Sequence, residues 1–264
     1  MQLSPIIGLP AIPTWPAIKQ LMVFGQSAEI SEHANYLQAI KVKHHAQGVS
    51  FHVKSCFDHV KDESNINSPL LGNFNVDNLL AAMAVLLVEG FSLTEVAKAV
   101  STITPIIGRM ESFQADNLPT AIVDYAHTPD GLISALQASR QHCAGELWVV
   151  FGCGGDRDKG KRALMGTAAE LNADHIVVTN DNPRTEPAND IVKDILLGCT
   201  TPEKVTVTLN REEAVMSTLA LAKPEDMVLL AGKGHEDYII IGNEKVPYNE
   251  RQLVENVYIN EALS

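Results

Sequence analysis

The chain has 264 residues, 45% hydrophobic and 20% charged, a composition that excludes a mostly disordered or collagen-like protein. Its 20 basic and 32 acidic residues give a formal net charge of −12, opposite in sign to that expected of a protein that binds the nucleic-acid backbone. Such a chain binds anions only where local Arg and Lys clusters or helix N-termini overcome the overall charge, so the basic clusters are the expected binding sites.

The cysteines and the apolar runs predict a cellular location. Cys56, Cys143, Cys153 and Cys199 form no C-x-x-C pair and fit no zinc spacing, which is typical of buried thiols in a reducing compartment. The sequence has no apolar run of about 18 residues and no signal-peptide pattern at its start. We therefore predict a cytoplasmic protein without a membrane or nucleic-acid partner.

The first part of the chain combines a proline-rich start with two strand-like segments. Four prolines before about Lys19 exclude a helix or a central strand, so this stretch is expected to be irregular. Residues 36–43 and 48–54 alternate apolar and polar side chains. This alternation predicts two half-exposed antiparallel strands.

Two helices are expected next. An apolar run that ends at Val88 predicts a buried helix, which Asn73 or Asn75 can cap. Ser92, followed three residues later by Glu95, predicts a second helix that begins with a capping box.

From residue 109 onward, strand-like and helical patterns alternate. The expected strands are TAIVDYA, ELWVVFG, DHIVVTN, KVTVTL and DMVLLAG, with helical patterns between them. YIIIG is expected to add an edge strand before a final helix. Apolar strands that alternate with amphipathic helices predict an α/β domain with a doubly wound, mostly parallel, Rossmann-like sheet. We place the domain boundary near residue 109.

Polar residues follow four of these strands, where ligands of open parallel sheets bind. This order places along one rim Asp124, His127, Arg157, Lys159, Lys161, Asn182, Arg184, Lys233, His235 and Glu236. So many polar residues at the same ends of the strands predict a functional cleft. For single residues other interpretations stay open: Arg184 can grip a carboxylate or lie in a surface turn, and His127 can be a core histidine.

One basic segment has the spacing of a nucleotide-binding loop. Residues 155–161 read G-x-x-x-x-G-K after a strand and before a helix, but Arg162 stands where such a loop carries Ser or Thr. The hydroxyl that would hold Mg²⁺ is therefore missing. We interpret the segment as an anion site at a helix N-terminus, or alternatively as a glycine-rich turn with solvated charges.

Four motifs in order, DYAHTPD, VFGCGGDRDKGKR, TNDNPRTE and AGKGHEDY, resemble the C-terminal domain of the Mur ligases. The resemblance is greatest to the members that add 2,6-diaminopimelate to UDP-N-acetylmuramoyl-L-alanyl-D-glutamate. LLGNFNVDNLLAA and GRME resemble the end of the family's central domain. The resemblance implies that residues 1–108 are part of a central ATP-binding α/β domain and that residues 109–264 are the domain that binds the incoming amino acid.

The resemblance also implies two sets of site residues. For meso-diaminopimelate they are Arg157, Asp181, Asn182, Pro183, Arg184, Gly232 and Glu236. For the nucleotide they are Asn78, Arg109, Asp124 and His127. The fork of the Arg184 guanidinium suits the second carboxylate of diaminopimelate, which lysine lacks, and Glu236 can pair with the distal ammonium.

The implied activity is ATP- and Mg²⁺-dependent amide formation through an acyl phosphate, by a monomer, in peptidoglycan precursor synthesis. It would serve cell wall biogenesis, cell shape and cell division. The family's P-loop, UDP-binding domain, carbamylated lysine and Mg²⁺ ligands are absent from these 264 residues. We therefore expect the chain to begin inside the central domain, with no assigned catalytic residue and no metal ligand.

Two alternatives come from other classes. The chain could be a non-catalytic amino-acid- or anion-binding module, or a degenerate Mur ligase relative. A dinucleotide-dependent oxidoreductase is disfavoured because no G-x-G-x-x-G opens the first α/β unit.

We predict that this chain alone shows no ligase turnover, because nothing in it would hold the γ-phosphate in line for transfer. The measurement is ADP release with ATP, Mg²⁺, meso-diaminopimelate and the UDP-muramoyl dipeptide. Sustained release that requires all the substrates would contradict the prediction.

Overall fold

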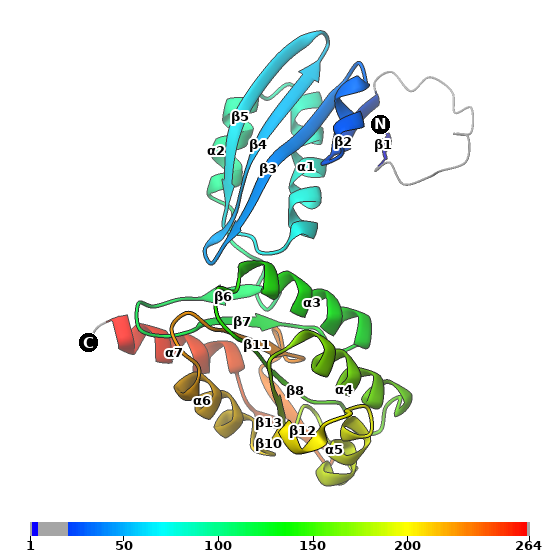
Figure 1. The fold of residues 1–264 in the computed structure, drawn as a ribbon, viewed down its shortest axis with the longest axis vertical. Coiled ribbons are helices and arrows are strands. Elements are labelled where there is room, and N and C mark those ends of the chain that lie inside the picture. The colour runs from blue at the N-terminus through cyan, green and yellow to red at the C-terminus, as the bar shows by residue number, and fades with distance from the viewer. Residues whose placement is uncertain (1, 5–20, 263–264) are drawn as a thin grey trace. The chain divides into compact units, whose positions relative to one another are not determined.

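The computed structural model describes residues 2–4 and 21–262, and the chain divides into two units, Met1–Thr104 and Pro105–Ser264 (Figure 1). The proline-rich stretch before Lys19, which was expected to be irregular, lies almost entirely outside the described residues.

The N-terminal unit contains a five-stranded sheet in the order β1-β2-β3-β4-β5. The first three strands run parallel, and β3, β4 and β5 form an antiparallel meander. The two predicted antiparallel strands are confirmed as β3 and β4, and both extend further than predicted. The sequence analysis missed β5, because it has few apolar residues and forms through its pairing with β4. The strands are β1 (Gln2–Ser4), β2 (Leu21–Gly25), β3 (Tyr36–His45), β4 (Gly48–Phe57) and β5 (Val60–Ser68).

Both helices of this unit, α1 (Asn73–Val88) and α2 (Leu93–Ser101), pack on one face of the sheet (Figure 1). The capping box of α2 is confirmed, since Ser92 Oγ accepts from the Glu95 N–H and the Glu95 carboxylate accepts from the Ser92 N–H. The predicted asparagine cap of α1 is wrong. Gly72, with φ 88°, occupies the N-cap position, so Asn73 is already helical. On the opposite face, the short 3₁₀ helix η1 (Ala28–Glu32) contributes a small apolar cluster.

The C-terminal unit is built on a six-stranded sheet in the order β10-β9-β8-β11-β7-β6. All neighbours are parallel except β6, which pairs antiparallel with β7. The predicted α/β class with a mostly parallel sheet is therefore confirmed. The strands are β6 (Glu111–Phe113), β7 (Thr120–Asp124), β8 (Leu147–Phe151), β9 (His175–Val178), β10 (Thr206–Val207) and β11 (Met227–Ala231).

Helices cover both faces of this sheet (Figure 1). On one face α3, α4 and α5 lie side by side, and on the other α6 and α7 enclose a core of aliphatic side chains from β7, β8, β9 and β11. The 3₁₀ helix η2 (Pro202–Lys204) precedes β10. The helices are α3 (Pro129–His142), α4 (Gly160–Asn172), α5 (Ala188–Leu196), α6 (Arg211–Leu221) and α7 (Glu250–Ala262).

The strand order brings four loops together. The chain passes from β7 through α3 to β8, and β11, the last strand of the sheet, then inserts between them. The carboxyl ends of β7, β8, β9 and β11 therefore meet at one edge. YIIIG does not add to this sheet as expected: it forms β12 (Tyr238–Ile241), which pairs antiparallel with β13 (Glu244–Pro247) as a separate hairpin. β11 already has β7 on one side and β8 on the other. The chain that follows β11 therefore finds no unpaired strand edge beside it to which β12 could add.

We predict that limited proteolysis cuts first before residue 109 and leaves a resistant C-terminal core. Most of the helical packing in the N-terminal unit lies on one face of its sheet, and the edge strand β5 is largely exposed, which favours local opening. Mass spectrometry of the early fragments is the measurement. Early cuts between residues 120 and 240, with the N-terminal unit intact, would show the opposite order of stability.

Candidate functional site

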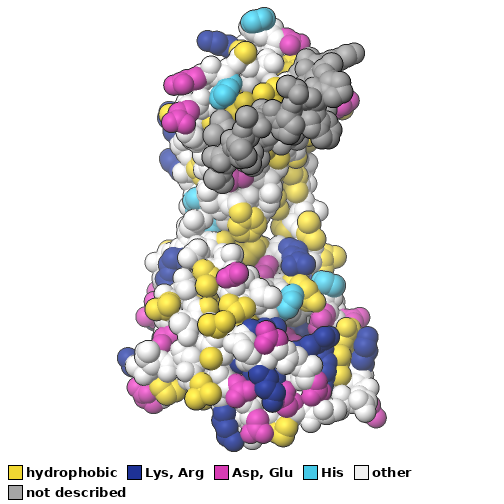
Figure 2. Space-filling model, turned by 90° about the vertical axis from the view of Figure 1, so that its right-hand side faces the viewer, with side chains coloured by type: hydrophobic (Ala, Val, Ile, Leu, Met, Phe, Trp, Pro, Cys, Tyr) yellow, Lys and Arg dark blue, Asp and Glu magenta, His cyan; other side chains and the backbone are white. Residues whose placement is uncertain are grey.

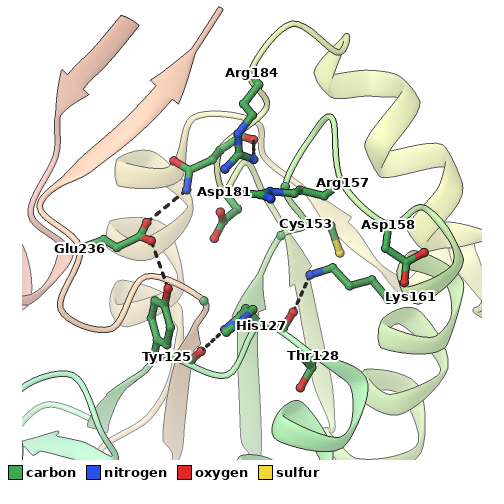
Figure 3. A pocket seen from close by; sticks show the side chains of 14 residues that line it. Tyr125, His127, Thr128, Cys153, Arg157, Asp158, Lys161, Asp181, Arg184 and Glu236 are labelled. Atoms are coloured by element: carbon green, nitrogen blue, oxygen red, sulfur yellow. Dashed lines mark hydrogen bonds between the residues drawn. The ribbon is translucent and has the colours of Figure 1, made fainter. Parts of the chain in front are cut away.

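A pocket of about 360 Å³ lies at the carboxyl ends of β7, β8, β9 and β11 in the C-terminal unit (Figure 3). Tyr125, Thr128, Cys153, Asp158 and Lys161 contribute to its wall. Most of the predicted site residues meet here. Those that line the pocket are His127, Arg157, Asp181, Asn182, Arg184, Gly232 and Glu236.

The other predicted residues lie elsewhere. Pro183 is buried behind the pocket wall, and Asn78 is exposed on α1, in the N-terminal unit. Asp124 is buried, and its two carboxylate oxygens accept hydrogen bonds from the backbone N–H groups of Met110 and Ala126 at 2.8 Å each. Burial raises the pKa of Asp124 although these N–H groups oppose the shift. Its carboxylate therefore holds the chain on either side of β7 and does not face the pocket.

The acidic side of the pocket is a network around a buried lysine. Lys233 has no solvent exposure, and its Nζ donates to Asn182 Oδ1 at 2.9 Å and to Glu236 Oε2 at 3.2 Å. Asn182 Oδ1 also accepts from the Ile240 N–H, so the amide nitrogen of Asn182 is turned toward Glu236 Oε2, 3.1 Å away. This arrangement fixes the orientation of both side chains.

Glu236 is held in its ionised form. Burial opposes ionisation, but hydrogen bonds from Asn182 and Lys233, together with the charge of Lys233, outweigh it and lower the pKa of Glu236. The Tyr125 hydroxyl also donates to Glu236 Oε1 at 3.4 Å. Burial in turn lowers the pKa of Lys233, with the carboxylates of Asp181 and Glu236 opposing the shift. An ionised carboxylate on the pocket wall suits an ammonium group.

The basic side of the pocket carries two guanidinium groups. Arg157 and Lys161 point into it from the side opposite Glu236 and Tyr125 (Figure 3). Arg184, with φ 52°, donates from Nη1 to the carbonyls of Gly155 at 2.9 Å and Asn182 at 3.3 Å. Within the described ranges, no carboxylate pairs with either Arg157 or Arg184. Both are therefore available to an acidic ligand.

Gly232 makes room between β11 and Asp181. Its φ of 113° suits glycine, and a Cβ at this position would lie 2.8 Å from Asp181 Oδ2. Gly232 also directly follows Ala231, whose carbonyl accepts from the buried Arg211 guanidinium at 2.9 Å. Arg211 also donates to the Asn180 carbonyl at 3.2 Å and to the two carboxylate oxygens of Glu250 at 2.5 Å and 3.0 Å, so it joins the loop after β9 to the end of β11.

The aromatic ring of Tyr125 forms a second cluster. The rings of His127 and His235 lie 4.7 Å and 5.0 Å from it, and the Arg109 guanidinium lies 4.9 Å from its centroid. Arg109 and His127 are both exposed. Two of the predicted nucleotide residues therefore gather on one tyrosine of the pocket wall.

Several charges of the segment with P-loop-like spacing have partners within the chain. The Gly160 N–H at the start of α4 donates to Asp158 Oδ1 at 2.8 Å, Lys161 donates to the His127 carbonyl, and Lys159 pairs with Glu186. Arg162 is fully buried. Lys159, Lys161 and Arg162 therefore bond to groups of the chain itself, although the side chain of Lys159 stays exposed. Arg157 of the same segment lines the pocket and pairs with no carboxylate among the described residues.

The sequence analysis did not predict that three cationic side chains are buried, namely those of Arg162, Arg211 and Lys233. Lys233 was placed on the rim of the cleft, but it lies beneath it with no exposure. Lysine and arginine are seldom fully buried, and no periodicity in a single sequence reveals the carboxylates that pair with them. The glycines that flank Lys233 were the one available signal, because they permit close backbone approach.

Among residues 2–4 and 21–262, no three His, Cys, Asp or Glu side chains form a group that could hold a metal ion. No described helix is both long enough and apolar enough to cross a bilayer.

Comparison with known proteins identifies the family. The Mur ligase middle domain matches residues 17–86, and the Mur ligase glutamate ligase domain matches residues 108–234. The structure of a UDP-N-acetylmuramoyl-L-alanyl-D-glutamate–2,6-diaminopimelate ligase is similar over 93% of this chain and 49% of its own, with 33% identity and a TM-score of 0.74. The chain belongs to the Mur ligase family, whose members are ATP-dependent amide ligases.

More distant structures share the fold. The UDP-N-acetylmuramate-alanine ligase MurC of Thermotoga maritima is 19% identical, with a TM-score of 0.57 over 91% of this chain and 52% of its own. The folylpolyglutamate synthase of the same organism is 17% identical, with a TM-score of 0.57 over 81% of this chain and 45% of its own. The chain spans about half the length of these relatives.

We predict that Asn182→Ala raises the pKa of Glu236, because the variant loses a hydrogen bond to the carboxylate while burial persists. In the wild type the pKa lies below the ordinary value of about 4.3, so Glu236 contributes stability that is present above that pH and is lost as the pH falls. The measurement is carboxyl ¹³C NMR of both proteins between about pH 3 and 7. Equal titration midpoints would contradict this role of Asn182.

Proposed function

We propose that this chain provides the amino-acid pocket of a ligase that adds meso-diaminopimelate to UDP-N-acetylmuramoyl-L-alanyl-D-glutamate. The reaction consumes ATP and belongs to peptidoglycan precursor synthesis in the cytoplasm. One observation carries the proposal: two guanidinium groups that pair with no carboxylate among the described residues line the same pocket as an ionised, hydrogen-bonded carboxylate. The 33% identity to a ligase whose name states this reaction supports the same substrate.

The pocket has the charge pattern of a diamino diacid. Diaminopimelate carries an ammonium and a carboxylate at each end. In the proposed complex the distal carboxylate pairs with Arg184 and the distal ammonium with Glu236, while Arg157 is available to the second carboxylate. Such charge-assisted hydrogen bonds are short and directional, so they fix the ligand's orientation as well as its affinity.

Orientation is the catalytic contribution expected of these residues. Holding both ends of the amino acid confines its reacting amine to one direction and removes much of the entropic cost of the encounter. ATP would supply the activation of the substrate carboxylate as an acyl phosphate. Arg109 and His127, which gather on Tyr125, are proposed as contacts for the nucleotide, with the exposed Asn78 as a further one. No group of three His, Cys, Asp or Glu side chains among the described residues could hold a metal ion, so these residues alone form no Mg²⁺ site.

Charge distribution is consistent with an anionic ligand despite the net charge of −12. Figure 2 shows Lys and Arg side chains gathered among Asp and Glu side chains on one face of the C-terminal unit. A local cluster of this kind can bind carboxylates because it acts at short range, where the more distant acidic residues are screened.

We predict that Arg184→Ala weakens meso-diaminopimelate binding about tenfold or more, because a charged hydrogen-bond pair is worth roughly 1.5–3 kcal/mol. L-Lysine, which lacks the second carboxylate, should lose less. The measurement is calorimetric titration of this chain and its variant with both amino acids.

Arg140→Ala is the matched control for this experiment, because Arg140 pairs with Asp174 outside the pocket. It should leave both affinities unchanged. Equal losses for the two amino acids in Arg184→Ala would assign Arg184 only the structural role of holding the Gly155 and Asn182 carbonyls. Failure of the wild type to bind meso-diaminopimelate would count against the proposed pocket.

A further inference from the structure

Arg162 on α4 has no solvent exposure and is surrounded by acidic and carbonyl groups. Its Nη1 and Nη2 donate to the two oxygens of Glu186 at 3.0 Å and 2.6 Å, a bidentate pair. Nη1 also donates to Asp194 Oδ2 at 2.8 Å, and Nη2 to the Gly154 carbonyl at 3.1 Å. Its Nε has no acceptor among the residues that the structure describes. The guanidinium is thus oriented by the groups that accept hydrogen bonds from its two terminal nitrogens, Nη1 and Nη2.

Two of these partners lie on the loops that form the basic side of the pocket. Gly154 belongs to the loop after β8, which carries Arg157, and Glu186 belongs to the loop after β9, which carries Arg184. The third partner, Asp194, lies on α5 and does not line the pocket. One guanidinium therefore joins the two loops to each other and, separately, to a helix.

Further hydrogen bonds join the same two loops. The Asp156 N–H donates to Glu186 Oε2 at 3.0 Å, and Asp156 Oδ2 accepts from the N–H and hydroxyl of Thr185 at 3.1 Å and 2.9 Å. The Gly155 N–H donates to the Asn182 carbonyl at 2.9 Å. Glu186 is shared by Arg162, Lys159 and the Asp156 N–H, so it is the centre of this connection.

We propose that the Arg162–Glu186 pair is a positioning device that sets the spacing between Arg157 and Arg184, and thereby the separation of the two carboxylates that the pocket accepts. This inference rests on the proposed binding of a diamino diacid. It adds a specificity mechanism: the pocket selects a ligand by length because its two guanidinium groups stand on loops held at a constant distance.

Two isosteric variants separate this role from general stability. Glu186→Gln and Asp194→Asn each remove one negative charge from the same buried guanidinium, but only Glu186 lies on a pocket loop. Glu186→Gln should weaken meso-diaminopimelate binding about tenfold, since small displacements of a binding group are costly. It should also reduce the preference for meso-diaminopimelate over its shorter homologue 2,5-diaminoadipate and its longer homologue 2,7-diaminosuberate. Asp194→Asn should lower the melting temperature while leaving affinity and preference unchanged.

Hydrogen exchange measured without ligand tests the device independently. In Glu186→Gln the amides of Gly155 and Asp156 should exchange faster than in the wild type, and in Asp194→Asn they should not. Equal effects of the two variants on exchange, or an unchanged preference among the three diacids in Glu186→Gln, would overturn the proposal. If the wild type binds none of the diacids, the proposed function fails, whereas the exchange result still decides whether the pair holds the loops.

Discussion

A buried guanidinium must be neutralised by carboxylates and carbonyls, and the pocket depends on this constraint. Two arginines without significant exposure, Arg162 and Arg211, lie beneath it, and an unpaired charge at either position would be strongly destabilising. Arg162 joins the loops after β8 and β9, and Arg211 joins the loop after β9 to the last residue of β11. Buried side chains thus hold the loops that carry the binding residues, and side chains such as Arg157 remain available to bind a ligand.

The order of the strands explains why these loops can be joined at all. Because β11 inserts between β7 and β8, residues from distant parts of the sequence lie within hydrogen-bond distance, as Tyr125 and Glu236 do. In parallel sheets the ends of neighbouring strands form a crevice of this kind. The separate β12–β13 hairpin adds to it, since the backbone of β12 contacts both Asn182 and Lys233.

The Glu236 carboxylate and the Arg184 guanidinium are held by different kinds of partner. Lys233 and Asn182 hold the Glu236 carboxylate ionised on one wall, while carbonyl groups hold Arg184 on the other without neutralising it. This separation makes an amphoteric small molecule the expected ligand and is the physical basis of the proposed function.

Much of this protein could be predicted from its sequence alone. Local patterns predict the alternation of strands and helices from Thr120 to Ala262 and the capping box at Ser92. They also predict that charged residues follow the ends of strands, as Arg157, Arg184 and Glu236 do. Local periodicity determines which residues form an element and which end of it they occupy. The family resemblance rests on the same contiguous motifs.

The tertiary structure decided what local patterns leave open. Contacts between residues far apart in the chain determine the strand order and the hairpin formed by β12. They also determine the burial of Lys233 and the pairing of Arg162 with Glu186. The sequence around Arg162 resembles an anion-binding loop, and only its partners, 24 and 32 residues further along, show that its charge is already neutralised. Whether a charged side chain binds a ligand or holds the fold is set by the groups that surround it in space, and these are chosen by tertiary packing.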